Sequence, residues 1–371
     1  MPEGRRGAVW STPALSQRSI PQPCGEKSKE PRPRQVKPDW VTAMKRFEQP
    51  SARKAAIQLT NTLLPYASLL VLMYLTMVWH LPYIVTLLIA VPASALLVRV
   101  FIFFHDCGHG SYVASPVWQR IIGSVLGVLT FASLADWRRA HGIHHSTSGN
   151  LDRRGIGDVW TMTMAEYAAS SPFRRLKYRL FRNPFVMFGL GPILSFLIKQ
   201  RLPTPGASRR QVLSVILTDL AIAGIIVAAS FTIGIKAYLL IQMPVILMAG
   251  SAGVWLFYIQ HQFDPSYWAR SDEWESMDAA MQGSSHYKLP KVMQWISGNI
   301  GLHHVHHLRP RIPNYNLQQC LNETPELQLP NPLRLGPSLR SVRYKLWDEK
   351  AHRLLTMKEA LLQLRQGPQP A

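Results

Sequence analysis

Two long stretches without charged side chains constrain the fold of this chain more than any other feature. Residues 55–98 contain no Lys, Arg, Asp or Glu, and residues 211–260 contain only one acidic and one basic residue. A membrane-spanning helix needs about 20 apolar residues, so each stretch is long enough for a helical hairpin. The stretches are interrupted at WHLPY (79–83) and FTIGIK (231–236), whose polar or helix-breaking residues suit a hairpin tip. The sequence therefore predicts an all-α integral membrane protein with four transmembrane helices, over residues 57–79, 82–104, 212–231 and 237–260.

Two shorter apolar runs need a different interpretation. Residues 121–135 and 184–198 each comprise 15 residues, which is below the length of a comfortable span. We interpret both runs as short interfacial or re-entrant helices. The alternative, in which one of them crosses the membrane with a tilt, stays open at this stage.

The basic residues are distributed unevenly along the chain, whose formal net charge is +20. The first 54 residues carry 12 Lys or Arg and residues 99–210 carry 15, whereas the two hairpin tips carry only Lys236. Since positive residues collect on the cytoplasmic side of spans, we expect both termini and the long middle connection to face the cytoplasm. Basic residues that flank spans are typical of contact with anionic lipid headgroups rather than with nucleic acid. A basic cytoplasmic face also suits an acidic protein partner.

The ends of the chain differ in composition from its middle. Residues 1–38 hold seven prolines and eight Lys or Arg, which predicts a disordered, basic, Pro-rich cytoplasmic tail. We expect the membrane domain to occupy residues 39–330 and a basic cytoplasmic tail to occupy residues 331–371. The three cysteines (Cys24, Cys107 and Cys320) show no CxxC spacing, so neither a disulfide framework nor a zinc ribbon is predicted.

Eleven of the 13 histidines fall in four places, and all four lie on the predicted cytoplasmic side. The four places are HDCGH (105–109), HGIHH (141–145), QHQ (260–262) and a segment that runs from SSHYKLP to GLHHVHH (284–307). Two of the clusters begin where a predicted span ends, at His105 and at His261. A site shared by the clusters requires an even number of membrane crossings between them, and zero is the simplest number.

The spacing within the clusters places histidines on common helix faces, because residues i and i+3 or i+4 share a face. The pattern groups His105 with His109, His141 with His144 and His145, and His303 with His306 and His307. Eight imidazoles are twice what a tetrahedral zinc ion needs and suit two ions of about six ligands each. His261 is a ninth candidate, and a histidine bonded to lipid headgroups is the alternative. The predicted metal ligands are His105, His109, His141, His144, His145, His261, His303, His306 and His307.

The type of donor indicates the chemistry. Ligation by nitrogen without thiolates admits iron, copper, nickel or zinc. A hydrolytic zinc site needs one ion and a carboxylate base, whereas eight or more histidines around two ions favour activation of O2. Four acidic residues are candidates to support the ligands, namely Asp106, Asp136, Asp152 and Asp158. Each of them can equally cap a helix or pair with a neighbouring arginine such as Arg138, Arg139, Arg153 or Arg154.

Four histidines stay outside the predicted ligand set. His304 lies about 100° from His303 around a helix, so we expect it to support the site rather than enter it. The role of His286 is open. His80 in an outer hairpin tip and His352 near the C-terminus are expected at the surface.

These residues resemble the membrane fatty acid desaturases with three histidine boxes. The family pattern HxxxH, HxxHH and HxxHH is matched by His105/His109, His141/His144/His145 and His303/His306/His307. The surrounding segments are similar too: HDCGHGSY, WRRAHGIHHSTSGNLDRRGIGDVW, YIQHQFDPSYWA and GSSHYKLPKVMQWISGNIGLHHVHHLRPRIPNYNLQ. The last two are similar to the delta-12/omega-6 acyl-lipid branch, and the resemblance covers residues 40–325.

The resemblance implies four transmembrane helices under a cytoplasmic helical cap, a di-iron centre held by histidines, O2 as co-substrate and two external electrons. It also implies a histidine ligand outside the boxes, which His261 matches. His286 departs from the pattern, since many relatives carry an aromatic residue there. The sequence contains no segment similar to cytochrome b5 or ferredoxin, so a separate donor of either kind is expected to supply the electrons. The branch favours a bacterial inner membrane.

The function implied is insertion of a cis double bond into a lipid-linked acyl chain. A histidine-rich di-iron hydroxylase of a fatty acid, sterol, carotenoid or alkane is the nearest alternative, because its metal site would look the same. A metal transporter or sensor would need a polar path across the membrane, and Asp219 is the sole acidic residue in the four predicted spans. Five aromatic residues either line an acyl tunnel or anchor the protein at the interface, namely Trp137, Phe263, Trp268, Tyr287 and Trp295.

Overall fold

The structure of the protein is a computed structural model that describes residues 38–366. All described residues except Pro38 belong to one compact unit, Asp39–Ala371, and the structure below is that of this unit. The disordered tail predicted for residues 1–38 lies outside the described residues apart from Pro38, and Cys24 lies outside them with it.

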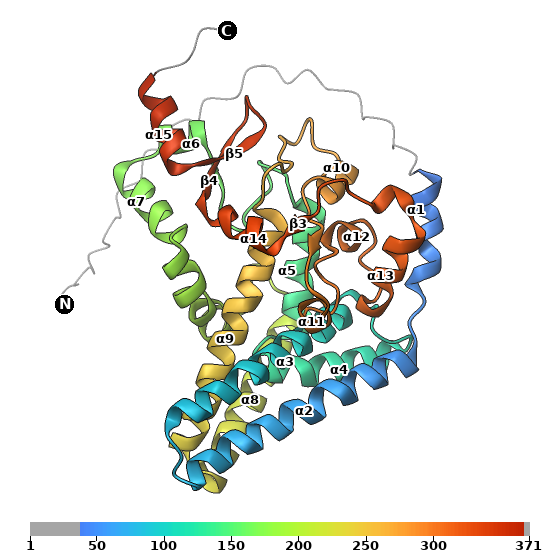
Figure 1. Cartoon of the computed structure of the whole chain (residues 1–371), viewed down its shortest axis with the longest axis vertical. Helices are drawn as coiled ribbons and strands as arrows, with labels where there is room; N and C mark the ends of the chain where they lie inside the picture. The colour runs from blue at the N-terminus through green and yellow to red at the C-terminus, as the bar shows by residue number, and fades with distance from the viewer. Residues whose placement is uncertain (1–37, 367–371) are drawn as a thin grey trace, which may run out of the picture. The chain divides into compact units, whose positions relative to one another are not determined.

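Four long helices carry the two uncharged stretches: α2 (Ala52–Val78), α3 (Tyr83–His109), α8 (Arg209–Thr232) and α9 (Ile235–His261). Each of them is long and apolar enough to cross a membrane. Helix α2 packs against α3, α8 packs against α9, and α3 also packs against α9. Both hairpin tips lie at the lower end of the view in Figure 1. The predicted class, an all-α membrane protein built on two helical hairpins, is confirmed.

The ends of two helices differ from the prediction in a way that matters for the site. Helix α3 does not end at residue 104 but continues to His109, because Gly110 provides the left-handed turn that closes it, with φ of 73°. Helix α9 likewise continues to His261. His105 and His261 therefore lie within the last turns of spanning helices rather than after them.

The two shorter apolar runs each belong to a pair of helices joined at a bend. Helix α4 (Pro116–Leu129) meets α5 (Leu134–Thr147) at 94°, and α7 (Pro172–Phe181) meets the helical segment Val186–Arg201 at 64°. The run predicted over residues 121–135 is thus broken between the two helices of the first pair. By length and composition each bent pair is either a broken span or a re-entrant loop. Helix α4 approaches α3 closely, since a Cβ at Gly123 would lie 2.9 Å from the Cβ of Cys107.

The other described helices are short. They are α1 (Asp39–Ala43), α6 (Met164–Ala169), α10 (Ser276–Met281), α11 (Lys291–Ile296), α12 (His303–Leu308), α13 (Asn314–Glu323), α14 (Leu335–Ser338) and α15 (Met357–Gln366), with 3-10 turns at Met44–Glu48, Lys199–Arg201, Pro325–Leu327 and Leu339–Arg343. Helix α12 packs against α10 and α13, and α5 packs against α3. Together these helices form a cap over the ends of α3 and α9 that carry histidines (Figure 1).

Within residues 38–366, five short strands complete the cap: β1 (Met162–Thr163), β2 (Tyr287–Lys288), β3 (Leu333–Arg334), β4 (Tyr344–Asp348) and β5 (Arg353–Thr356). Strand β4 lies between β1, to which it is parallel, and β5, to which it is antiparallel. Strand β2 pairs in parallel with β3. The sequence placed the end of the membrane domain at residue 330, but the residues that follow fold onto it. Leu346 and Leu355 share a buried core with Tyr167 and Tyr178, so their burial ties this segment to the cap.

Candidate metal centre

The nine histidines predicted as ligands come together in two groups. The first group comprises His105, His109, His141, His145 and His306, and the second comprises His144, His261, His303 and His307. Within each group, one ring nitrogen from every histidine lies within 4.8 Å of the others. Each group therefore offers the converging nitrogen donors that a metal ion needs.

Four helices deliver these side chains. Helix α3 gives two histidines to the first group, and α9 gives His261 to the second. Helix α5 gives His141 and His145 to the first group but His144 to the second. Helix α12 does the reverse, with His306 in the first group and its other two box histidines in the second. The sequence pattern had placed all three histidines of each HxxHH box on one face, and this division between two groups was not predicted.

The ring nitrogens are arranged for metal ions rather than for hydrogen bonds to one another. The Nε2 atom of His261 lies 3.0 Å from the Nε2 atoms of both His144 and His303. One ring nitrogen carries either a hydrogen or a lone pair, so it cannot make two good hydrogen bonds of this kind at once. The Nε2 atoms of His109 and His307 are buried without a hydrogen-bond partner. A cation that accepts the converging lone pairs resolves both problems, so the donor set fits metal ions.

The surroundings favour the neutral form of the imidazoles, which is the form that binds metal. Burial lowers the pKa of His145, His306 and His307 well below the ordinary value, and repulsion from neighbouring histidines lowers it further. The same two causes lower the pKa of His141 and His303. These side chains are therefore uncharged at neutral pH and present lone pairs to the centre of each group.

Two of the four candidate carboxylates touch a histidine, one in each group. In the first group, the Nδ1 of His105 lies 3.1 Å from the Oδ1 of Asp106. The other oxygen of Asp106 accepts hydrogen bonds from the backbone and side-chain nitrogens of Asn314, at 2.7 and 2.9 Å. In the second group, the Nδ1 of His144 lies 2.8 Å from the Oδ1 of Asp158. Such a contact fixes the tautomer in which Nδ1 carries the hydrogen and Nε2 points at the metal position.

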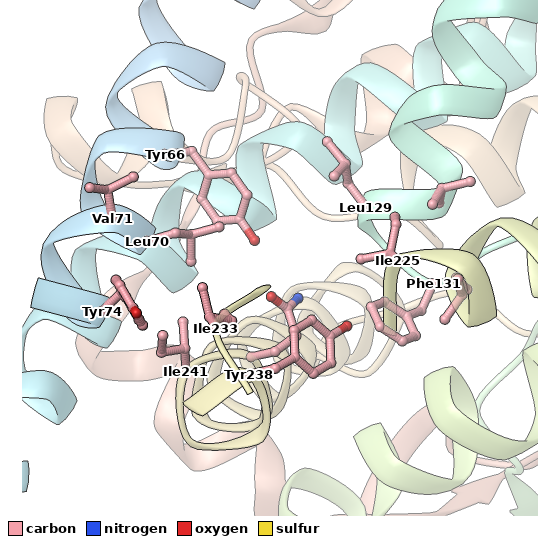
Figure 2. Close-up of a pocket in the computed structure, with 13 residues that line it drawn as sticks. Tyr66, Leu70, Val71, Tyr74, Leu129, Phe131, Ile225, Ile233, Tyr238 and Ile241 are labelled. Carbon is pink, nitrogen blue, oxygen red and sulfur yellow. The ribbon is translucent and has the colours of Figure 1, made fainter. Parts of the chain in front are cut away.

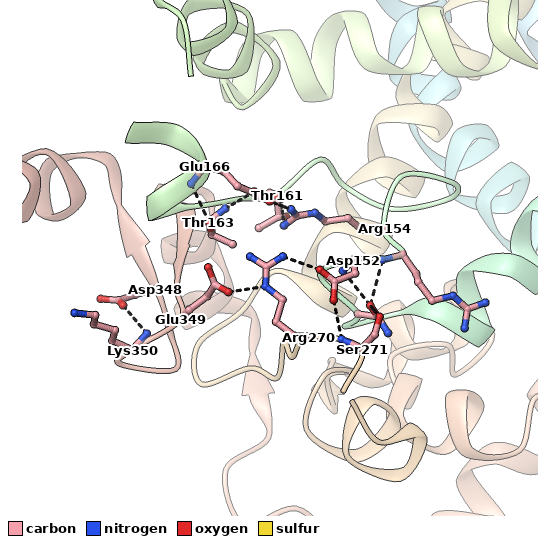
Figure 3. Close-up of polar contacts among 12 residues, drawn as sticks. Asp152, Arg154, Thr161, Thr163, Glu166, Arg270, Ser271, Asp348, Glu349 and Lys350 are labelled. Carbon is pink, nitrogen blue, oxygen red and sulfur yellow. Dashed lines mark hydrogen bonds and ion pairs between the residues drawn. The ribbon is translucent and has the colours of Figure 1, made fainter. Parts of the chain in front are cut away.

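The other two candidate carboxylates have structural roles. Asp136 accepts hydrogen bonds from the backbone N–H and the hydroxyl of Thr204. Asp152 binds Arg270, which also binds Glu349, so that one guanidinium joins two carboxylates from distant parts of the chain (Figure 3). The sequence had suggested arginines adjacent in sequence as partners for these acids, and for Asp152 the structure uses a distant one.

The remaining histidines lie outside both groups. His304 is buried, and its Nε2 lies 2.9 Å from the carbonyl oxygen of Leu327. Burial and the nearby His286 lower the pKa of His304 to about 4. His286 stacks on His304 at a ring distance of 5.2 Å. His80 and His352 are exposed, as expected.

Two supporting residues escaped the sequence argument. Asn314 holds Asp106, although its position as the first residue of α13 carried no signal of that role. Gly108 allows Trp137 to lie against α3, because a Cβ at Gly108 would be 2.6 Å from the ring of Trp137. Trp137 in turn stacks on His141 at a ring distance of 4.3 Å. The sequence had named Trp137 only as a residue that either lines a tunnel or anchors the protein.

A cavity of about 340 Å³ lies away from the histidines, among α2, α4, α8 and α9. Figure 2 shows Tyr66 and Tyr238 on opposite sides of it, among leucine and isoleucine side chains. None of its 13 lining residues belongs to either histidine group. This cavity is therefore separate from the metal centre, and the path of an acyl chain past the histidines stays a prediction.

The fold and the site together define a membrane protein in which helix ends converge on two clusters of histidines able to hold metal ions. The sequence model of the family named Fatty acid desaturase matches residues 78–334. A fatty acid desaturase from Bacillus subtilis (strain 168) is 45% identical over 303 residues, which cover 82% of this chain and 86% of that protein. The chain therefore belongs to the fatty acid desaturase family, and it is an oxidoreductase that acts on fatty acids.

More distant relatives carry names that state a double-bond position. The sn-1 oleoyl-lipid 12-desaturase of Synechocystis is 27% identical over 232 residues, or 60% of this chain and 63% of that protein. The chloroplastic sn-2 acyl-lipid omega-3 desaturase (ferredoxin) of Arabidopsis thaliana is 27% identical over 241 residues, or 60% of this chain and 51% of that protein. Because the named positions differ at equal identity, these similarities do not select one position for this chain.

Proposed function

We propose that this protein is an O2-dependent acyl-lipid desaturase of the delta-12/omega-6 type, with two iron ions held by the nine histidines. The observation that carries the proposal is the convergence of those histidines in two adjacent groups, each with one buried carboxylate. When bound, two iron ions with O2, two electrons and two protons would supply the oxidising power that removes two hydrogens from adjacent methylenes, giving a double bond and two waters.

The protein's own part in this reaction is to prepare the site. The neutral imidazoles would leave the charge of bound ions largely uncompensated. Asp106 beside His105 and Asp158 beside His144 each bring one carboxylate next to a group. Five of the nine histidines are buried and the other four are half-buried, which limits the access of water and so the side reactions of a reactive centre. Trp137 holds His141 by stacking and presents an apolar surface beside the first group, as an acyl chain requires.

Several finer features belong to the same proposal. We infer that the histidine groups and both termini face the cytoplasm, since the basic residues flank the spans on that side. A bacterial inner membrane is the proposed location. A separate ferredoxin or cytochrome b5-like protein would supply the electrons, and the name of the Arabidopsis relative supports the first. The delta-12 position rests on similarity to the segments around His261 and the third box.

The test is product analysis in a bacterial host that expresses the full chain, beside an empty-vector control. Total fatty acids are separated by gas chromatography and mass spectrometry. Dimethyl disulfide adducts locate the double bond in monoenes, and pyrrolidide derivatives locate the bonds in dienes. The expected product is a diene whose second double bond begins at carbon 12.

Other products would change the proposal in different ways. A new monoene or diene unsaturated at another carbon would overturn the delta-12 position while keeping the desaturase. A hydroxylated fatty acid would favour the hydroxylase alternative. A transporter would change cellular metal content without a new fatty acid. A transporter would need Asp219 as part of a polar path across the membrane, but Asp219 forms an ion pair with Arg201.

A further inference from the structure

Arg182 is a buried cation that binds only neutral acceptors among its described contacts. Its side chain is 1% exposed and follows the last residue of α7. One terminal nitrogen donates to the side-chain oxygen of Gln262 and to the carbonyl of Tyr344, each at 2.8 Å. The other donates to the carbonyl of Trp160 at 3.2 Å. A buried charge is costly unless its hydrogen bonds are satisfied, so this arrangement serves to hold its partners in place.

Two of these partners lead directly to the second histidine group. Gln262 immediately follows His261, and its amide nitrogen also donates to the hydroxyl of Thr161 at 2.9 Å. Trp160 lies two residues after Asp158, the carboxylate that binds His144. Arg182 therefore joins the chain beside His261 to the chain beside Asp158. His261 and the histidine bound by Asp158 are the pair whose Nε2 atoms meet at 3.0 Å.

The third partner belongs to the segment after residue 334, where the match to the family ends. Besides Tyr344, this segment contacts α9 through Ser341, whose carbonyl accepts from the hydroxyl of Tyr258 at 2.8 Å. In the same segment, the backbone N–H of Leu354 donates to the carboxylate of Asp264 at 3.1 Å, and Asp264 lies three residues after His261. The C-terminal strands thus close around the end of α9.

The same segment also holds the loop between His145 and Asp158. Glu349, in the turn after β4, binds Arg270 at 2.7 Å, and Arg270 binds Asp152 in that loop at 2.7 Å (Figure 3). This contact lies at the surface, since Asp152 and Arg270 are about 40% exposed. It supports the loop from outside, while Arg182 supports it from within.

We propose that Arg182 is the positioning residue of the second histidine group, and that this group binds its ion only when the C-terminal hairpin β4–β5 is folded against α9. The inference rests on the proposed function, since it assumes that each group holds one ion. The first group is held differently. Its α3 histidines lie on the last turns of a helix whose preceding residues Phe103 and Phe104 are in the buried core, and its carboxylate Asp106 is fixed by Asn314 rather than by the C-terminal segment.

The experiment compares full-length variants purified in detergent, loaded with ferrous iron and washed free of excess metal. Arg182→Met removes the guanidinium. Gln262→Met removes only two hydrogen bonds next to His261 and serves if the first variant does not fold. Arg175→Met is the matched control. Arg175 lies on α7, the helix that ends just before Arg182, and its described contacts are the carbonyls of Tyr167 and Ala168 and the ring of Tyr167. Iron per chain is measured by mass spectrometry, and the oxidised protein is examined by electron paramagnetic resonance.

We expect two iron ions per chain in the wild type and in Arg175→Met, and one in Arg182→Met or Gln262→Met. The variants with one ion should show the resonance of an isolated ferric ion, which a coupled pair lacks. Two ions retained in Arg182→Met, or both ions lost together, would overturn the inference while leaving the proposed function standing. A wild-type chain that binds no metal would overturn the proposed function itself and this inference with it.

Discussion

The contact between Asp158 and His144 gives the sharpest test of how the protein prepares its metal centre. The two side chains meet at 2.8 Å and are 6% and 1% exposed, so water cannot replace either partner. Asp158→Asn keeps the shape and an acceptor oxygen but removes the charge. Loss of a partner of this kind typically lowers metal affinity by about 10- to 100-fold. At about 1.4 kcal/mol for each factor of ten, this corresponds to roughly 1.4 to 2.8 kcal/mol.

The matched control is Asp152→Asn, six residues earlier in the same loop. Asp152 is 40% exposed and binds Arg270 rather than a histidine. Ferrous iron affinity is measured by competition with chelators of graded strength. We expect the affinity for the more weakly bound of the two ions to be about 10 to 100 times lower in Asp158→Asn than in the wild type. The affinity of Asp152→Asn should be close to that of the wild type.

Two outcomes would refute this reasoning. Equal affinities in all three proteins would mean that the carboxylate does not orient His144 toward an ion. An equal loss in both variants would mean that the loop as a whole, rather than the contact with His144, sets the affinity. Circular dichroism of each variant shows that the helices are intact before the comparison is made.

Three further predictions follow from particular contacts. His306→Ala should abolish the fatty acid product while the protein still inserts in the membrane, whereas His80→Ala should retain full product; both are measured by gas chromatography of host lipids. The backbone N–H of Ser271 and then Arg270 lower the pKa of Asp152, and Arg270 lowers the pKa of Glu349. The contribution of both carboxylates to stability is therefore complete above about pH 4.5 and is lost as the pH falls through their lowered pKa values. Arg270→Gln should therefore shift acid-induced protease cleavage at the β4–β5 turn to higher pH, and an unchanged midpoint would count against this. Gly108→Ala forces a Cβ to within 2.6 Å of Trp137, and it should reduce product formation by tenfold or more because His141 must move with that ring; unaltered turnover of a folded variant would show that the ring shifts without effect.

The sequence predicted the membrane helices and the histidine boxes of this protein well, because the strongest signals in the sequence are local. A stretch of 44 residues without a charge has few alternatives to membrane helices. Histidines three and four residues apart likewise indicate a helix that faces a common site. The errors at the helix ends have a local cause as well, since hydropathy falls at His105 although the helix continues until Gly110.

The sequence could not reveal which distant residues meet. Nothing near Asp158 distinguishes it from Asp152, since both follow the second box in a loop rich in arginine. Their different roles depend on where Arg270 and His144 lie in space. The same holds for Arg182, whose partners lie 22, 80 and 162 residues away along the chain. Such contacts are set by the packing of the cap and leave no pattern of spacing.

The division of the histidine boxes between the two groups explains why the centre needs two HxxHH helices rather than one. In helix α5, the first and last box histidines belong to the first group and the middle one belongs to the second group. In helix α12, the first and last box histidines belong to the second group and the middle one belongs to the first group. Residues three apart on a helix are separated by about 4.5 Å along the axis. The backbone of each helix therefore fixes the distance between the two histidine groups, and α5 and α12 must impose the same distance. Because helices are stiffer than loops, α5 and α12 would set the distance between two bound ions, while the spanning helices α3 and α9 each complete one group.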